Sequence, residues 1–279
     1  MLPYTYTING DHDRQQSVPQ LEHSRVFETH FPEEDIPLGL FMLNIKHGDG
    51  CRIHSYINEI KPVDDKFEAY KATVHLDTWR TPLLADAGCT WLDVSRWDRE
   101  FQFGRQRGTG ELKKDQGSAQ VYTFSRPFAE VPKVVVWLNT FNSWGKYDLR
   151  ILAQAINVTT TEFTLDVQTW DDSVLHDSKV SWIAVPQNWP NVAAGDYVFK
   201  NDEALPEYKQ DITFDKPFKR APRVLVALNK IHASKDHGLQ IEAKAESITP
   251  EGMTLSVKSR EDSKIFEAGV SYIAIEDAD

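Results

Sequence analysis

Cysteine, long apolar runs and excess positive charge are scarce in this chain of 279 residues. Its two cysteines, Cys51 and Cys89, are too few for a disulfide scaffold. We expect two reduced, buried thiols, with a pairing between them left open. No run of about 18 apolar residues is present, so no membrane span is predicted. The formal net charge of -11 argues against a nucleic-acid partner, because binding to phosphates relies on excess Lys and Arg.

Signatures of catalysis and of metal binding are also missing. The nine histidines include no H-E-x-x-H pair or other metal-ligand spacing, and no Gly-rich phosphate loop or G-x-S-x-G elbow occurs. The acidic doublets Glu33-Glu34, Asp64-Asp65 and Asp171-Asp172 lie in turn-like contexts, where solvated carboxylates are expected. We therefore predict no enzyme, no metal site and no cofactor.

One sequence pattern occurs three times along the chain. Each copy has an apolar-Pro pair that leads through a β-branched or apolar stretch to an Asn seven residues after the Pro: Pro37 to Asn44, Pro132 to Asn139, and Pro222 to Asn229. A second spacing of twelve residues also recurs in all three copies: Trp79 to Trp91, Trp170 to Trp182, and Arg260 to Tyr272. Agreement at several anchors indicates an internal repeat.

The repeats divide the chain into six parts. Residues 1–23 form an N-terminal arm, which either packs on the body, where it could cover a sheet edge, or extends as a tail. Repeats follow at 24–95 (the most diverged), 118–187 and 208–279. The segments 96–117 and 188–207 are rich in Gly, Lys, Asp and Pro and are predicted as linkers made of loops or connecting strands.

Apolar residues alternate with period two in every shared segment, which is typical of β-strands. We predict an all-β fold of three tandem six-stranded antiparallel β-sandwich repeats, with Trp91 and Trp182 in the core. One strand is apolar on both faces, for example at Val135 and Trp137, and so is buried on both faces. The predicted counterparts in the first repeat are Leu38, Leu40 and Met42. Packing of this second face on neighbouring repeats gives an intramolecular pseudo-trimer; the alternative is packing on another chain.

The order F-x-x-P-F, P-x-V-x-V-x-L-N, R-I-x-A, T-W-x-D-S and V-S-W-I-A resembles the H-type lectin domain, a family that includes snail agglutinins and the carboxy-terminal domain of discoidins. The second repeat, Phe124 to Val185, and the third, Phe214 to Ile275, carry most of the resemblance. The first, about Phe31 to Val94, matches at its anchors. The resemblance implies a six-stranded sandwich, assembly as trimers that sometimes pair into hexamers, and binding of galactose or N-acetylgalactosamine.

The resemblance also implies site residues. In the family an Arg, a His after the T-W pair, an aromatic residue and a loop Asp contact the sugar. The second repeat has Arg150 at the first position, Asp171 at the second, His176 at the third and, by a loose match, Asp115 at the fourth. Its loop adds three further candidates beside Arg150: Trp144, Tyr147 and Asp148. Two alternatives stay open: the aromatic pair covers the end of the sandwich, or Arg150 forms a structural ion pair with Asp171 or Asp166.

The other two repeats depart further from the family pattern. The first has Arg52 at the Arg position, Arg80 at the His position and Ala85 at the aromatic position. The third has Gln240, Glu261 and Phe266 at the same three positions. Because no repeat reproduces the full set, the familiar sugar specificity does not follow for this chain.

We therefore predict a multivalent lectin that binds glycans or glycoconjugates of the galactose or N-acetylgalactosamine type, or related ones, without catalysis. The alternative is a degenerate lectin-fold scaffold for protein–protein contact. The N-terminus lacks the apolar stretch of a secretory signal, which predicts a cytoplasmic protein. Release to act on external glycans stays open. We expect a monomeric pseudo-trimer and leave open whether it dimerises.

Overall fold

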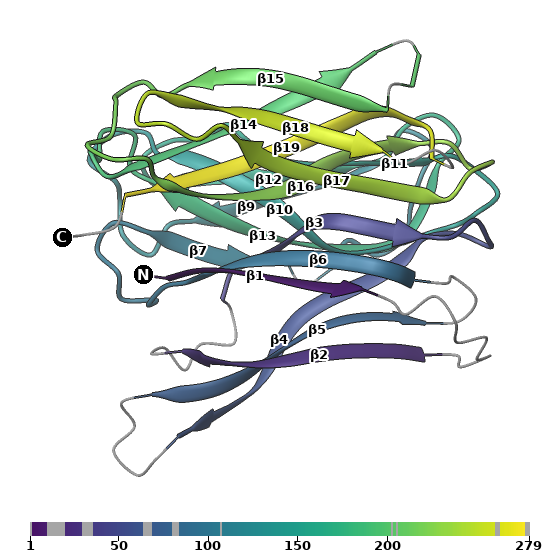
Figure 1. The fold of residues 1–279 in the computed structure, drawn as a ribbon, viewed down its shortest axis with the longest axis horizontal. Coiled ribbons are helices and arrows are strands. Elements are labelled where there is room, and N and C mark those ends of the chain that lie inside the picture. Colours follow the sequence, from purple (N-terminus) through teal and green to yellow (C-terminus); the bar gives the residue numbers. More distant parts are fainter. Residues whose placement is uncertain are drawn as a thin grey trace.

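The computed structural model describes residues 2–9, 20–29, 36–63, 69–79, 84–106, 108–201, 203–204, 206–259 and 263–276. Within these ranges every helix or strand is a β-strand, so none of them forms a helix that could span a membrane. The all-β prediction is confirmed. The nineteen strands of the described ranges form three antiparallel sheets (Figure 1).

The three sheets contain the following strands, from one edge to the other. Sheet A contains β1 (Leu2–Asn9), β6 (Leu84–Asp93), β3 (Leu38–Ile45), β17 (Leu239–Glu246), β18 (Gly252–Ser259) and β15 (Glu207–Thr213). Sheet B contains β2 (Gln20–Thr29), β5 (Tyr70–Trp79), β4 (Arg52–Pro62), β10 (Lys133–Ser143), β13 (Val174–Val185) and β7 (Gln102–Arg105), with β8 (Leu112–Lys113) also paired to β13. Sheet C contains β14 (Val192–Lys200), β19 (Ile265–Ile275), β16 (Arg223–Ala233), β11 (Leu149–Ile156), β12 (Glu162–Gln168) and β9 (Gly117–Thr123).

Every sheet is shared between two repeats. In sheet A the first repeat meets the third where β3 pairs with β17. In sheet B the second repeat meets the first where β10 pairs with β4, and in sheet C the third meets the second where β16 pairs with β11. The three contacts close a ring, because each repeat is hydrogen-bonded to both of the others.

Each repeat forms a six-stranded sandwich from halves of two sheets. In the second repeat, β7, β13 and β10 face β11, β12 and β9, and the ring centroids of Trp182 and Phe163 lie 5.0 Å apart between the two layers. Trp91 and Trp182 are only 1% and 6% exposed, as predicted for core residues. Strands β1, β7 and β14 come from the predicted arm and linkers and complete the sandwiches. Residues 2–9 of the predicted arm thus pair with β6 at the edge of sheet A, and residues 20–23 begin β2, which pairs with β5 at the edge of sheet B.

A second apolar cluster lies where the three sandwiches meet. It contains Val135 and Trp137 of β10 and Leu225 and Ala227 of β16, which confirms that this strand is buried on both faces. The third strand at this centre is β3, which contributes Gly39. A Cβ atom at Gly39 would lie 2.6 Å from the Cβ atoms of both Trp137 and Ala227. The absence of a side chain at Gly39 therefore leaves room for the indole of Trp137.

The predicted alignment of the first repeat is wrong by three residues. The shared Pro-to-Asn spacing equates Leu38 with Lys133, but Leu38 pairs with Trp91 as Val136 pairs with Trp182. Leu38 and Leu40 consequently lie in the sandwich core, and Gly39 occupies the central position predicted for its neighbours. A strand that is apolar on both faces leaves its register weakly specified by pattern alone, because a slip still buries apolar side chains.

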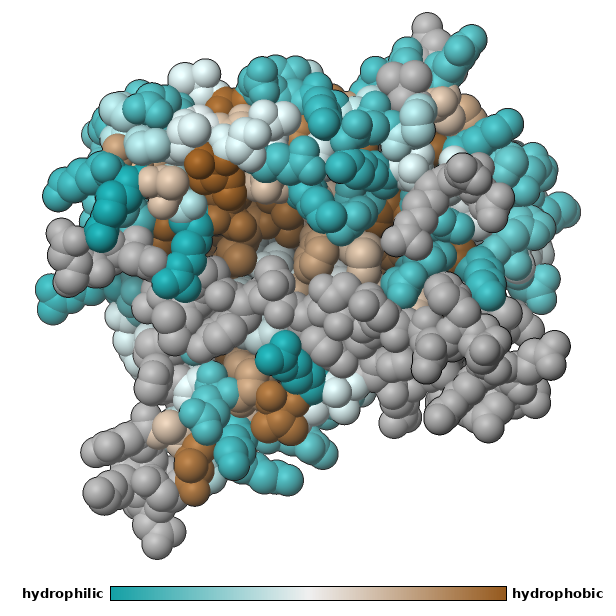
Figure 2. Space-filling model, viewed as in Figure 1, coloured by the Kyte–Doolittle hydropathy of each residue, from teal (hydrophilic) through white to brown (hydrophobic). Residues whose placement is uncertain are grey.

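Among the coloured residues of Figure 2, hydrophilic ones predominate, and hydrophobic ones show in a hollow in the upper half of the view. Among the described residues only seven large hydrophobic side chains are exposed, among them Trp97 and Trp144. Both cysteines are free thiols; Cys89 is buried and Cys51 is half-buried.

Candidate functional site

The three repeat boundaries place equivalent residues side by side. Arg52, Arg150 and Gln240 stand near the starts of β4, β11 and β17. Across the boundary they pair with Asn142 of β10, His232 of β16 and Asn44 of β3, respectively. One strand further, each boundary carries an acidic residue: Asp177, Glu267 and Asp86. Each boundary therefore combines polar groups of two repeats.

At the β11–β16 boundary, Arg150 is held by carboxylates of its own repeat. Its Nη2 lies 3.0 Å from Asp148 Oδ2, its Nη1 2.6 Å from Asp172 Oδ1 and its Nε 3.4 Å from Asp171 Oδ2. The Arg150 side chain is 11% exposed, whereas those of Asp171 and Asp172 are 65% and 56% exposed. The guanidinium thus lies in the floor of the site, and two of its carboxylates face solvent.

His232 joins this site from the third repeat and was not predicted from the sequence. Arg150 Nε donates a hydrogen bond of 3.2 Å to His232 Nε2, so the proton of the neutral ring is on Nδ1. Burial, with the charge of Arg150 adding to it, lowers the pKa of His232, and the ring is therefore neutral at pH 7. Its neighbours are the aromatic rings of Trp170 and Phe266, at 5.9 and 5.0 Å. No sequence signal could have placed a side chain 82 positions away beside Arg150.

Asp115, the loose match to the loop Asp of the family, lies beside Asp171. Its Oδ1 accepts a hydrogen bond of 2.9 Å from the backbone N–H of Asp171. Both residues have a positive φ, 57° for Asp115 and 53° for Asp171, a conformation that Asp tolerates better than most residues. This bond fixes the turn that presents the Asp171 carboxylate to Arg150.

Trp144, Tyr147 and His176 form a separate group. The ring of Trp144 lies 5.9 Å from that of Tyr147 and 6.3 Å from that of His176. Trp144 and Tyr147 also line a small cavity of about 30 Å³ where the loops 46–51, 143–149 and 233–239 meet. Among the described contacts none joins Trp144 to the guanidinium of Arg150. Of the two roles predicted for the Trp144–Tyr147 pair, covering the end of the fold therefore agrees better with this placement.

The remaining predicted site residues are divided among other places. Asp148 belongs to the Arg150 group, and its Oδ1 also accepts a hydrogen bond from the backbone of Lys235. Arg52 is buried, and its Nη2 donates to the backbone oxygen of Asp49 at 3.4 Å. Arg80 lies outside the described residues. Asp166, the alternative partner of Arg150, accepts hydrogen bonds from Gln154 and Gln168 instead.

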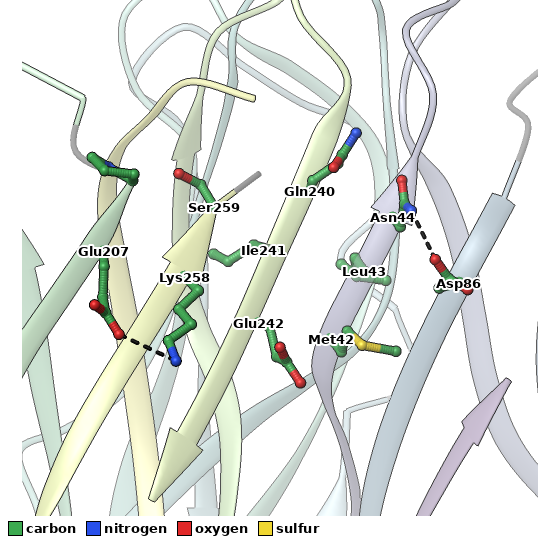
Figure 3. A pocket seen from close by; sticks show the side chains of 11 residues that line it. Met42, Leu43, Asn44, Asp86, Glu207, Gln240, Ile241, Glu242, Lys258 and Ser259 are labelled. Atoms are coloured by element: carbon green, nitrogen blue, oxygen red, sulfur yellow. Dashed lines mark hydrogen bonds and ion pairs between the residues drawn. The ribbon is translucent and has the colours of Figure 1, made fainter. Parts of the chain in front are cut away.

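The β3–β17 boundary forms an open groove of about 310 Å³ (Figure 3). Gln240 and Asn44 lie at one end, where Asn44 Nδ2 donates to Asp86 Oδ2 at 2.8 Å. Glu207 and Lys258 form an ion pair of 3.2 Å on its far side. The groove offers amides and carboxylates without the arginine of the other two boundaries.

An ion-pair cluster lies next to His232 at the β11–β16 boundary. Glu267 contacts both Lys230 and Lys200, and the Lys230 ammonium stands 5.1 Å above the ring of Trp170. Burial alone would raise the pKa of Glu267, but these two lysines outweigh it and hold the pKa below its ordinary value. Within the described ranges, no group of three or more His, Cys, Asp or Glu side chains is arranged to hold a metal ion.

Comparison with protein families gives a match to two of the three repeats. Residues 119–185 and 209–275 match the H-type lectin domain. These stretches make up a little less than half of the chain and coincide with the second and third repeats. They contain Arg150, Asp171, His232 and Glu267, so the β11–β16 boundary lies between the two matched stretches.

Two individual proteins are similar to shorter parts of the chain. A curated protein of Fuscovulum blasticum, described as ATP synthase subunits region ORF 7, is 33% identical over 69 residues; these are 25% of this chain and 60% of that protein. The chain therefore spans less than two thirds of the length of this relative. Wild-type discoidin II from Dictyostelium discoideum is similar in structure over 60% of this chain and 78% of its own, with 15% identity and a TM-score of 0.29.

Proposed function

We propose that this protein is a non-catalytic carbohydrate-binding protein whose main site is the β11–β16 boundary around Arg150. The observation that carries the proposal is the match of both adjoining repeats to the H-type lectin domain, together with the placement of Arg150 at their junction. The resemblance favours sugars of the galactose or N-acetylgalactosamine type. Because Asp171 stands where the family has a histidine, the sugar that this site binds has to be determined by measurement.

The site has the chemistry that a sugar requires. Adjacent sugar hydroxyls suit a forked guanidinium as acceptors and carboxylates as donors. Asp171 and Asp172 are more than half exposed, and ion pairs with exposed partners contribute only about 0–1 kcal/mol. Sugar hydroxyls can therefore insert between Arg150 and these carboxylates at small cost. The ring of Trp170, which lies beside His232 and under the Lys230 ammonium, adds an aromatic group of the kind that sugar C–H groups pack on.

The ring of three boundaries supports multivalent binding. Each repeat is hydrogen-bonded to the other two, so one chain presents on a single body what a trimer of separate subunits would present. Shallow sugar sites bind weakly, because they exchange hydrogen bonds with water for similar ones with protein. Sites fixed on one body gain an effective concentration that compensates for this weakness.

A second candidate function is supported by the same arginine. All three guanidinium nitrogens of Arg150 already contact Asp148, Asp171, Asp172 or His232. Such a saturated cluster also fits a structural role, in which the chain is a scaffold for protein–protein contact.

A glycan array separates the two candidates. The labelled chain is applied beside Arg150→Ala, with Arg99→Ala as a control at an exposed position outside the boundaries. Binding to a coherent set of glycans that only Arg150→Ala abolishes supports the proposed site. Binding that survives Arg150→Ala but is lost in Arg52→Ala moves the site to the first repeat. No binding by any variant at high protein concentration contradicts the proposed function and favours the scaffold.

A further inference from the structure

The β4–β10 boundary opens into a groove of about 420 Å³, which is larger than the groove of about 310 Å³ at the β3–β17 boundary. It is lined by His54 and Tyr56 of β4, Thr140 of β10, Lys179 of β13 and residues 105–106 at the end of β7. This volume lies within the range of small-molecule sites, which is about 300–1,000 Å³. Its lining includes residues 54–57 of β4 but not Arg52, so the groove is distinct from the position that the family resemblance assigns to the sugar.

Charge sets this groove apart from its two counterparts. Lys179 pairs with Thr140 next to the boundary, and the equivalent residues of the other repeats are Gly88 and Gly269. His54 corresponds to Glu242 at the β3–β17 boundary. No Asp or Glu is among the described residues that line the groove, whereas the β3–β17 groove has three acidic residues and one lysine. In a chain of net charge -11, this groove is locally basic.

Two polar side-chain atoms in the walls of the groove lack a hydrogen-bond partner among the described residues. Gln106 and Thr140 are 2% and 4% exposed, yet Gln106 Oε1 and Thr140 Oγ1 have no hydrogen-bond partner among the described residues. A buried polar atom without a partner costs about 1–3 kcal/mol. Lys179 likewise has no ion-pair partner in the described part of the chain. A ligand that carries both hydroxyls and an anionic group would supply partners of both kinds.

Stacked rings form one wall of the groove. The ring centroids of His54 and Tyr56 lie 4.4 Å apart, and His75 stacks on the other face of Tyr56 at 4.5 Å. The stack holds His54 in place beside Lys179. Burial, with the charges of Lys179 and His75 adding to it, lowers the pKa of His54 to about 4. At pH 7 the ring is therefore neutral and able to donate one hydrogen bond and accept another.

We propose that this groove is a second ligand site, which takes an acidic sugar and binds its carboxylate through Lys179. The inference rests on the proposed carbohydrate-binding role and adds the class of sugar to it. Lys179 pairs with the carboxylate, while Gln106, Thr140 and His54 bind ring hydroxyls. The β4–β10 groove, which no acidic residue of the described ranges lines, thus favours an acidic sugar, whereas three carboxylates surround Arg150 at the β11–β16 site.

The test compares two sugars that differ only at C6, D-galacturonate and D-galactose, by calorimetry and by NMR titration of the full chain. At low salt we expect galacturonate to bind about tenfold more tightly than galactose, since a charge-assisted hydrogen bond is roughly twice as strong as a neutral one. Lys179→Gln should reduce this preference to within about twofold, while Lys179→Arg and the distant control Lys216→Gln should keep it.

The possible results separate this inference from the proposed function. A preference for galacturonate that survives in Lys179→Gln overturns the assignment of the groove. Equal binding of both sugars by the wild-type chain, with loss of both in Arg150→Ala, overturns the second site and leaves the proposed function standing. Binding of neither sugar overturns both. Loss of the preference in Lys179→Gln with unchanged galactose binding supports the groove.

Discussion

Placing one methyl group at Gly39 tests the packing of the three repeats at their centre. In Gly39→Ala the new Cβ would lie 2.6 Å from the Cβ atoms of Trp137 and Ala227. Carbon atoms in contact prefer a separation of about 3.5–4.0 Å, so each strand would have to move by about 1 Å. Such overpacking costs about 1–3 kcal/mol. The loss of glycine's freedom in the unfolded chain returns about 0.4–1 kcal/mol.

The middle values of these two ranges give an expected net loss of about 1.3 kcal/mol, and each kcal/mol lowers the Tm by about 2–4 °C in a chain of this size. The assay is unfolding in urea followed by tryptophan fluorescence, in which a lower midpoint at constant slope reports a change in stability. Gly48→Ala is the matched control, because its Cβ would have no neighbour nearer than 3.9 Å. We expect this control to be neutral or slightly stabilised.

A second substitution makes the reasoning refutable. Ala227→Gly removes one of the two crowding Cβ atoms, so it should destabilise the wild-type chain but restore part of the stability of Gly39→Ala. Residues in contact couple by about 0.5–3 kcal/mol in such a double-mutant cycle. Equal stability of Gly39→Ala and Gly48→Ala, or an equal effect of Ala227→Gly in both backgrounds, would refute the proposed central contact.

Two further predictions concern titrating groups. His54 has a pKa lowered from 6.5 to about 4, so the folded chain resists a proton that the unfolded chain accepts. Its contribution to stability is therefore present above about pH 6.5 and is lost as pH falls toward 4, and His54→Gln should flatten the pH dependence of the unfolding free energy in that window; parallel profiles for the two chains would contradict this. Burial raises the pKa of the Cys51 thiol to about 12 and raises that of Cys89 as well. Ellman's reagent should therefore react slowly with the native chain, and both thiols should become reactive after unfolding. A fast reaction of either thiol in the native chain would contradict this prediction.

The sequence predicted much of the fold because the relevant signals are local. Period-two alternation identified the strands, and the apolar character of Val135 and Trp137 identified the strand that is buried on both faces. The same signal misplaced the first repeat. Pro37 and Asn44 imitate the anchors of the other copies, whereas register is fixed by the pairing of Leu38 with Trp91. That pairing joins residues that lie far apart in the chain.

The candidate site was predicted in part for a related reason. Arg150, Asp148 and Asp171 come from the second repeat and Asp115 from the linker before it; the family resemblance and the loop beside Arg150 pointed to them, and the structure brings them together. His232 comes from the neighbouring repeat, and its contact with Arg150 exists only because β11 pairs with β16. Each boundary consists of strands from two repeats, so each site combines residues of both. A motif search within one repeat finds only the residues that this repeat supplies.

The sharing of sheets also explains why the three boundaries differ in chemistry while keeping one geometry. Pairing across a boundary uses backbone hydrogen bonds, and the inward residues Ile53, Ile151 and Ile241 are all buried isoleucines that hold the register. The residues that alternate with them differ between the boundaries: they are Arg52 and His54, Arg150 and Leu152, and Gln240 and Glu242. The three boundaries can therefore differ in charge through substitutions at these positions, while the buried isoleucines stay the same. The fold therefore sets where the three boundaries lie, and residues such as Lys179 set the charge of each boundary.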